Sequence, residues 1–193
     1  MSETAEISAL SAPPATSKAG RFDHVSIAFH WAVVLLVAGQ LTTAWLLIQG
    51  GDEGSAGLLT LHRSMGLITW GVGAARLFWR RRFAYLPPFP ASMPKLQQSI
   101  AKANEYGLYA MLLLQPLTGL GDTVFRGRAF NFFVWKIPAV LPSVKPAFHV
   151  FHAAHEIGAI TLLTLIGLHA LAAIFHALRG DGVVARMLPW TRP

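Results

Sequence analysis

Histidines are the side chains with most of the chemistry in this sequence: there are eight of them, and no cysteine. A chain without cysteine forms no disulfide, carries no cysteine-ligated iron–sulfur cluster and attaches no haem covalently, because covalent attachment uses a C-x-x-C-H motif. Four histidines, His30, His62, His155 and His169, lie inside or at the edge of long apolar stretches. Ionisable side chains are costly in such stretches, so we expect these four to be functional.

The apolar stretches that hold these histidines are long enough to cross a bilayer. Hydrophobic residues make up 53% of the chain and charged residues only 13%, whereas about a quarter of the residues in a soluble domain are charged. A helix needs about 20 apolar residues to cross the hydrocarbon core. Four windows meet this length: residues 27–49, 58–79, 106–125 and 153–178. We therefore predict an all-α fold, a transmembrane four-helix bundle, with residues 21–193 as one domain.

Residues 1–20, which precede the first window, are rich in Ala, Ser, Thr and Pro. They contain no positively charged segment followed by an apolar run, which a signal peptide would need. Their composition favours a disordered tail.

Lysine and arginine are unevenly distributed among the connections. They occur before the first window, between the second and third, and after the fourth, whereas residues 50–57 carry only Asp52 and Glu53 as charges. Because basic residues favour the cytoplasmic side, both termini are predicted to be cytoplasmic. The net charge of +7 thus reflects topology, and no nucleic-acid partner is expected.

The connection between the third and fourth windows breaks this pattern. It places four basic residues on the outer side, close to Arg63 of the second window: Arg126, Arg128, Lys136 and Lys145. A positive outer surface concentrates anions and raises their encounter rate; the alternative roles are headgroup anchoring and solubility. Residues 130–135 (FNFFVW) are too short to span, and we predict that they lie at the membrane interface, anchored by Trp135.

The predicted orientation gives the depth of each histidine. His30 lies near the inner end of the first window, and His62 lies near the outer end of the second. His155 and His169 are fourteen residues apart on the fourth window, close to four helical turns and about 21 Å along one helix face. The histidines therefore form an inner pair, His30 with His169, and an outer pair, His62 with His155. The third window offers no ligand and is predicted to pack the bundle.

Two neutral imidazoles that face each other across a bundle suit a haem with both axial positions filled, which favours electron transfer over oxygen binding. Zinc fits less well, because it needs three or four ligands close together. Structural histidines, hydrogen-bonded inside the bundle, are the other alternative, although four at matched depths are hard to explain in that way. Glycines on the same windows offer room for porphyrin faces or for close helix packing: Gly66, Gly71, Gly73, Gly119, Gly158 and Gly167.

The other histidines lie outside the two pairs. His24 precedes the first window and is predicted to be a surface residue, and His149 and His152 precede the outer pair and are predicted to cap or line that surface. His176 lies near the cytoplasmic interface, where it either lines a quinone pocket or contacts lipid headgroups.

From Arg21 to Pro189 the sequence resembles the prokaryotic cytochrome b561 family. The matching stretches are RFDHVSIAFHW, LHRSMGLITWGVGAARLFWR, QPLTGL and HEIGAITLLTLIGLHALAAIFHALRGDGVVARMLP. The resemblance implies a four-helix bundle in the bacterial inner membrane with two b haems on the four histidines, and it places His176 near an inner quinone site. Family members studied as superoxide oxidases take an electron from superoxide at the periplasmic face and deliver electrons to ubiquinone. This sequence departs from the family in its longer N-terminal tail and in its third loop.

The expected function is therefore superoxide:ubiquinone oxidoreduction by a di-haem b cytochrome in the lipid bilayer. Superoxide needs no acid or base to lose its electron, so the outer basic residues are expected only to steer it, whereas His176 is a candidate to relay protons to quinone. An alternative is a membrane anchor and electron conduit for a partner dehydrogenase that docks on the third loop. A haem-free, histidine-lined metal transporter is a third possibility, which the near absence of carboxylates in the four windows disfavours.

Overall fold

The computed structural model describes residues 20–50 and 55–190. Within them the chain forms four long helices: α2 (His24–Gln49), α3 (Ser55–Arg82), α4 (Lys95–Phe125) and α5 (Lys145–Arg179). The short elements are β1 (Phe130–Phe132), β2 (Trp135–Ile137) and a 3₁₀ turn, η2 (Val184–Met187). The all-α prediction is thus confirmed. The tail predicted to be disordered lies outside the described residues except for Gly20, as do Asp52 and Glu53.

Two of the helices are apolar enough to cross a membrane by themselves. These are α2, with 26 residues and a mean hydropathy of 1.9, and α5, with 35 residues and a mean hydropathy of 2.2. The other two are more polar, because α3 carries Arg76 and a terminal arginine cluster and α4 begins in a polar segment. With 28 and 31 residues, they are about 42 and 46 Å long, more than the roughly 30 Å of a hydrocarbon core.

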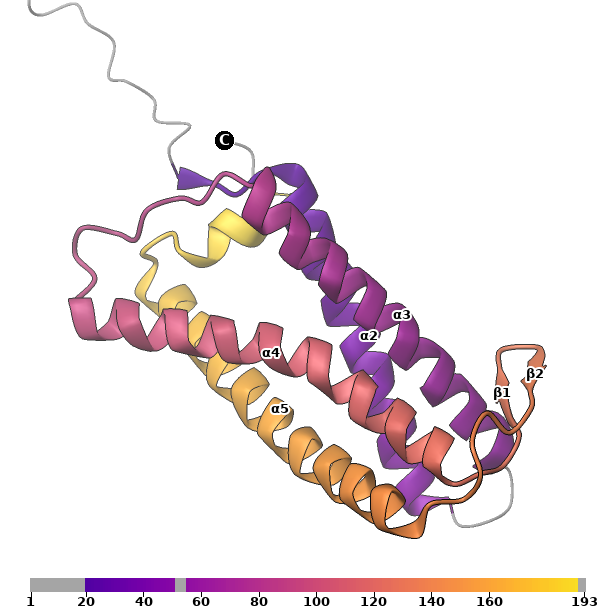
Figure 1. Ribbon diagram of the computed structural model, residues 1–193. Helices are drawn as coiled ribbons and strands as arrows, with labels where there is room; N and C mark the ends of the chain where they lie inside the picture. Colours follow the sequence, from indigo (N-terminus) through magenta and orange to yellow (C-terminus); the bar gives the residue numbers. More distant parts are fainter. Residues whose placement is uncertain (1–19, 51–54, 191–193) are drawn as a thin grey trace, which may run out of the picture.

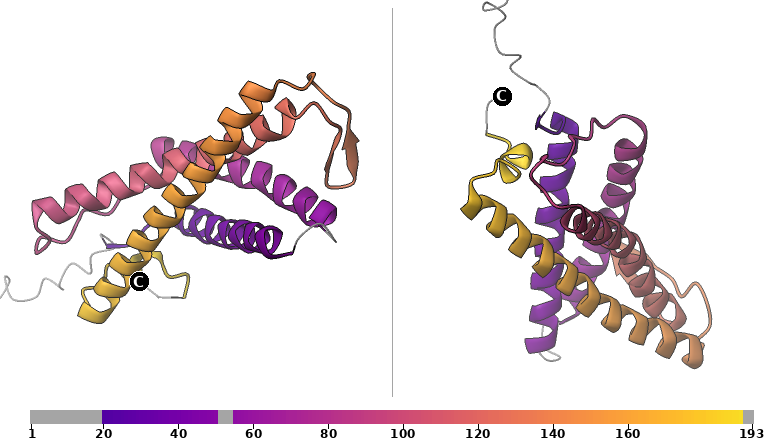
Figure 2. Two further views of the ribbon diagram at one scale, coloured as in Figure 1. Left: turned by 90° about the horizontal axis from the view of Figure 1, so that it is seen from below. Right: turned by 90° about the vertical axis from the view of Figure 1, so that its left-hand side faces the viewer.

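The helices pack as two antiparallel pairs. Helix α2 packs along α3 and α4 packs along α5, while α3 and α4 join the two pairs (Figure 1). Viewed from below, α4 and α5 are inclined to α2 and α3 (Figure 2). The β1–β2 hairpin lies at the end where α3 begins and α4 ends, and both ends of the described chain lie at the opposite end (Figure 1). These two ends are called the outer and inner ends below, after the predicted orientation.

Helices α4 and α5 begin earlier than the apolar windows predict. Helix α4 starts at Lys95 rather than at residue 106, and α5 starts at Lys145 rather than at residue 153. The prolines of the preceding loop end at Pro94, and the sequence after it is rich in good helix formers. In α5 a proline occupies the first turn, where its missing N–H costs nothing. His149 and His152 therefore lie on α5 rather than in the loop before it.

The aromatic segment of the third loop forms a hairpin. Strands β1 and β2 are antiparallel, and Phe133 takes a positive φ of 49° in the turn between them. The backbone N–H of Phe133 donates to Oγ of Ser64 at 2.8 Å, which attaches the turn to α3. Trp135 is 62% exposed in the chain, and its anchoring at the membrane interface stays a prediction.

The C-terminal segment closes the inner end. The indole Nε1 of Trp31 donates to the carbonyl of Met187 at 2.9 Å, and the Arg21 guanidinium donates to the carbonyl of Leu188 at 2.8 Å. Arg186 donates in turn to the carbonyl of Pro88 at 2.7 Å, in the loop between α3 and α4. The ARMLP segment thus ties the start of α2 to the inner loop.

The start of α2 is held by a carboxylate. Asp23 caps the helix by accepting from the backbone N–H of Ser26 at 2.9 Å, and it also accepts from the indole N–H of Trp79 at 3.0 Å. Burial alone would raise the pKa of Asp23, but these hydrogen bonds outweigh it and the pKa lies below its usual value. The cap therefore joins α2 to the end of α3.

Candidate functional site

The structure brings the four histidines together in the two pairs that their depth predicts. The ring centres of His30 and His169 are 6.2 Å apart, with an angle of 61° between the rings. The ring centres of His62 and His155 are 6.3 Å apart, with the rings perpendicular at 90°. Helix α5 supplies one histidine to each pair, facing α2 at the inner end and α3 at the outer end.

The distance within each pair suits two imidazoles on opposite sides of one metal ion. With metal–nitrogen bonds of about 2 Å, the two ring centres are expected to be roughly 6 Å apart. The helices that carry each pair, α2 with α5 and α3 with α5, are not among the closely packed neighbours. No group of three or more His, Cys, Asp or Glu side chains suited to a metal ion occurs in the part of the chain described. The donor set therefore fits a haem with two axial histidines better than zinc.

The outer histidine of α3 is fixed by two polar residues of α2. The amide Nε2 of Gln40 donates to the backbone carbonyl of His62 at 2.9 Å, and Oγ1 of Thr43 lies 2.9 Å from Nδ1 of His62. The Thr43 hydroxyl has its own acceptors, the carbonyls of Gly39 and Gln40, each at 3.0 Å. Because its proton goes to a carbonyl, this hydroxyl accepts from Nδ1–H of His62, and Nε2 carries the free lone pair.

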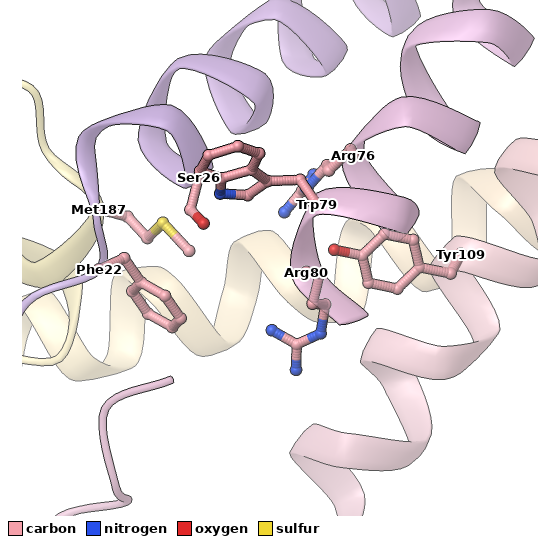
Figure 3. A pocket seen from close by; sticks show the side chains of 7 residues that line it. All are labelled: Phe22, Ser26, Arg76, Trp79, Arg80, Tyr109 and Met187. Carbon is pink, nitrogen blue, oxygen red and sulfur yellow. The ribbon is translucent and has the colours of Figure 1, made fainter. Parts of the chain in front are cut away.

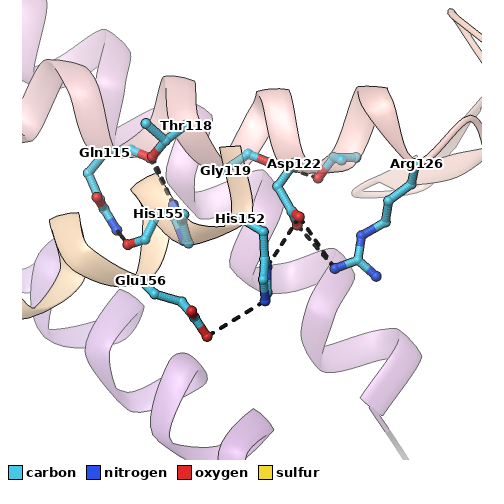
Figure 4. Close-up of polar contacts among 9 residues, drawn as sticks. Gln115, Thr118, Gly119, Asp122, Arg126, His152, His155 and Glu156 are labelled. Carbon is cyan, nitrogen blue, oxygen red and sulfur yellow. Dashed lines mark hydrogen bonds and ion pairs between the residues drawn. The ribbon is translucent and has the colours of Figure 1, made fainter. Parts of the chain in front are cut away.

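The outer histidine of α5 is fixed in the same way by α4, as Figure 4 shows. The amide Nε2 of Gln115 donates to the backbone carbonyl of His155 at 2.8 Å, and Oγ1 of Thr118 lies 3.1 Å from Nδ1 of His155. The Thr118 hydroxyl donates to the Gln115 carbonyl at 2.8 Å, so it too accepts from the imidazole. Helix α4, predicted only to pack the bundle, therefore contributes to the site.

Three of the glycines considered for porphyrin faces or for close helix packing lie against these polar contacts. A Cβ at Gly66 would lie 3.2 Å from the Gln40 amide, and one at Gly158 would overlap the Gln115 amide. A Cβ at Gly119 would lie 2.9 Å from the His155 ring. Gly73 has ordinary contact with α4, and Gly71 and Gly167 face open space.

Among the residues that the structure describes, none forms comparable hydrogen bonds with the inner pair. Within the residues described, Nδ1 of His30 is buried without a hydrogen-bond partner, and His169 is the most exposed of the four histidines. The guanidinium of Arg76 is close enough to act electrostatically on both rings. Arg76 lines a small pocket with Trp79, Arg80 and Tyr109, seen in Figure 3.

Of the two arginines in this pocket, only Arg80 is paired with a carboxylate in residues 20–50 and 55–190. Arg80 forms an ion pair with Glu105 at 2.7 Å. The Arg76 guanidinium lies 5.3 Å from the centre of the Tyr109 ring, on which it stacks. The surroundings of the inner pair are therefore positively charged.

His176 lies two helical turns beyond His169 on α5, about 10 Å further along the helix. Its Nδ1 is 2.5 Å from the Asp181 carboxylate, and its Nε2 is 3.3 Å from the amide nitrogen of Gln97. The hydrogen bond from His176 holds the pKa of Asp181 below its usual value. The side chain of His176 is only 11% exposed, so it is a sheltered imidazole with a carboxylate partner.

The five basic residues predicted to steer anions occupy the outer end but differ in surroundings. Arg126 pairs with Asp122 at 3.2 Å and lies over the Phe148 ring at 4.7 Å. Arg63 is half-buried in α3, whereas Arg128, Lys136 and Lys145 are exposed.

Asp122 also lies beside His152, a histidine that was predicted to cap or line this surface. Nδ1 of His152 lies 3.3 Å from Asp122, and its Nε2 lies 3.6 Å from Glu156 (Figure 4). His24 is exposed, as predicted for a surface residue.

Sequence reasoning missed the polar residues around the outer histidines. Gln40 with Thr43 and Gln115 with Thr118 share the spacing Gln-x-x-Thr, QLTT and QPLT. Residues three apart lie on one helix face, so the repeat itself was a signal. Asp181 was also missed, five residues after His176.

Comparison with known proteins agrees with this geometry. The family model described as prokaryotic cytochrome b561 matches residues 21–190. Cytochrome b561 homolog 1 of Escherichia coli (strain K12) is 29% identical over 178 residues, which cover 88% of this chain and 97% of that protein. Cytochrome b561 homolog 2 of the same organism is 25% identical and covers 90% of this chain and 94% of its own length. A protein named probable superoxide oxidase CybB from Yersinia pestis is 24% identical over 89% of this chain and 98% of that protein. The chain therefore belongs to the prokaryotic cytochrome b561 family, whose members are haem b proteins that transfer electrons in the membrane.

Proposed function

We propose that this protein is a di-haem b cytochrome that oxidises superoxide at the outer face of the bacterial inner membrane and reduces ubiquinone near the inner face. The observation that carries the proposal is the presence of two histidine pairs with ring centres 6.2 and 6.3 Å apart. In this proposal His30 and His169 hold the inner haem, and His62 and His155 hold the outer one. Both termini then lie in the cytoplasm.

In this proposal the two histidines of each pair would hold one haem between them, which would leave no coordination position for oxygen. When bound, haem supplies a one-electron iron couple at each end of the bundle. Helix α5 is continuous from His155 to His169, so it fixes the separation of the two pairs at about 21 Å along its axis.

The outer end suits a small anionic donor. Superoxide gives up one electron and leaves as dioxygen, with no bond formed to the protein and no proton exchanged. Basic residues at the outer end raise the local concentration of such an anion, and Arg128, Lys136 and Lys145 are exposed at that end. The relative named as a probable superoxide oxidase supports this choice of donor.

The inner end suits a proton-requiring acceptor. Ubiquinone takes two electrons, hence two superoxide ions, and two protons to become ubiquinol. In this proposal His176 relays those protons through Nε2, which accepts from the Gln97 amide, while Nδ1–H donates to the Asp181 carboxylate and so orients the ring.

Rapid mixing of the purified protein with superoxide, with and without ubiquinone, tests the proposal. We expect superoxide to reduce the b haems and ubiquinone to reoxidise them, with both steps followed by the haem absorbance. Removing the positive charge of the exposed cluster, for example in the triple variant R128Q/K136Q/K145Q, should slow the first phase and weaken its dependence on ionic strength. Haems that are present but do not respond to superoxide would contradict the choice of donor. They would favour the alternative of an electron conduit for a partner protein that docks on the third loop.

A further inference from the structure

Side chains of the neighbouring helices bind the two outer histidines in the same repeated arrangement, and no such arrangement binds the inner histidines in the described part of the chain. Helices α2 and α4 each present a glutamine and, three residues later, a threonine to the histidine of the following helix. We propose that these two Gln-x-x-Thr clamps are positioning residues that make the outer haem the harder of the two to reduce. The inference rests on the proposed function, because it assumes a haem at each pair.

Each clamp fixes its histidine at two points. The glutamine amide holds the backbone carbonyl, at 2.9 Å for His62 and 2.8 Å for His155. The threonine hydroxyl holds Nδ1, at 2.9 Å for His62 and 3.1 Å for His155. The first contact sets the position of the helix turn, and the second sets the rotation of the ring and its tautomer. Nε2 would then be the nitrogen left free to bind iron.

The same hydrogen bonds change the electronic character of the ligand. An imidazole that donates its second N–H to an acceptor becomes a more basic ligand. A more basic ligand stabilises ferric over ferrous iron, and hydrogen bonding around the ligands is one of the means by which proteins tune haem potentials. Nδ1 of His155 has a further acceptor within reach, the Gln115 carbonyl at 3.1 Å, which acts in the same direction.

The inner pair lacks this effect among the residues described. Nδ1 of His30 is buried without an acceptor, and His169 has no hydrogen bond to any described group. The positive charge of Arg76 acts on both inner rings and favours the ferrous state. At the outer pair Arg63 acts on the His62 ring, but two carboxylates, Asp122 and Glu156, act on the His155 ring in the opposite sense, and Asp122 also pairs with Arg126.

Hydrogen bonding and charge therefore both act to make the reduction potential of the outer haem lower than that of the inner haem. The outer haem has the lower potential and the inner haem the higher, so an electron that enters at the outer end moves downhill towards the inner end. Transfer from an outer donor to an inner quinone is thus favoured by the protein itself.

Replacing the threonine hydroxyls while keeping their volume tests the clamps. The variants are T43V and T118V, singly and together, and the matched control is T42V. Thr42 is the exposed neighbour of Thr43, and among the residues described its hydroxyl bonds only the carbonyl of Ala38, at 2.9 Å. The readout is a spectroelectrochemical titration of both b haems in the purified, haem-replete protein. The outer haem is identified as the one missing from H155A.

We expect T43V and T118V to raise the potential of the outer haem and leave that of the inner haem unchanged, with the larger shift in the double variant. A tenfold change in the ferric-to-ferrous equilibrium corresponds to about 59 mV for one electron. T43S and T118S keep a hydroxyl and should restore the wild-type potential, and T42V should have no effect. Loss of the outer haem in the valine variants together with its retention in the serine variants would also support the clamps.

Haem-replete T43V and T118V proteins whose outer potential is unchanged would overturn the proposal. A wild-type outer potential above the inner one would overturn it as well. A wild-type protein that binds fewer than two haems would instead contradict the proposed function, so the two failures are distinguishable.

Discussion

The two ends of the bundle use the same ligand chemistry but hold it differently. At the outer end each histidine is bonded by side chains of a neighbouring helix, and glycines on α3 and α5 leave room for those side chains. At the inner end the histidines lack such bonds among the described residues, and a guanidinium and the C-terminal segment lie nearby instead. The comparison teaches that identical ligands acquire different properties from the groups around them.

The largest effect is expected from a substitution of Gly158 that displaces the Gln115 side chain of the outer clamp. A Cβ at Gly158 would overlap the Gln115 amide, so G158A should displace the amide from the His155 carbonyl. Overpacking of this kind costs about 1–3 kcal/mol. We expect weaker retention of the outer haem and an unchanged inner haem, measured by haem absorbance during thermal denaturation. G57A is the matched control, because Gly57 is exposed and an added Cβ there would meet nothing within 4 Å; equal behaviour of the two variants would contradict the clamp.

A smaller effect, confined to the inner end, is expected from the cap of α2. D23A removes the acceptor for Ser26 and Trp79, and loss of an N-cap costs about 1 kcal/mol. Because the pKa of Asp23 is lowered in the folded protein, its contribution is present above the unfolded pKa of about 3.9 and is lost as the pH falls through the folded value.

The difference in thermal stability between wild type and D23A should therefore be constant near neutral pH and should shrink below about pH 4. H24A, at the exposed neighbouring position, serves as the control. A difference that persists at low pH would show that the carboxylate charge does not contribute to the cap.

The smallest effect is expected from the charge at the inner pair. R76Q removes the cation that acts on both inner rings, so the ferrous state should lose stability and the inner potential should fall. We expect a shift below about 59 mV, less than tenfold in the equilibrium, with the outer potential unchanged. R82Q, at the exposed end of α3, should leave both potentials as they are. An equal shift of both haems in R76Q would argue against a local effect.

The histidine pairs could be predicted from the sequence because the depth of a residue in the bilayer depends only on its position along its spanning segment. Window order, loop charge and the spacing of His155 and His169 place each histidine along the bundle without knowledge of helix packing. The clamps depend on which face of α2 meets α3 and which face of α4 meets α5, and hydropathy does not report this. Only the repeated Gln-x-x-Thr spacing hinted at them.

Two features of the fold were missed for different reasons. Hydropathy marks the part of a helix that faces lipid, so it placed the starts of α4 and α5 too late, where polar turns extend beyond the apolar windows. The β1–β2 strands have three residues each, too few for alternation to be recognised. Their turn is attached by one bond to Ser64, a contact that no local pattern indicates.

The haem content of four single variants, H30A, H169A, H62A and H155A, tests the assignment of the two haem sites most directly. The wild type should bind two haems per chain and each variant one. H30A and H169A should share one residual spectrum, and H62A and H155A should share the other. A variant that keeps both haems with unchanged spectra, or residual spectra that group the histidines in any other way, would contradict the pairing.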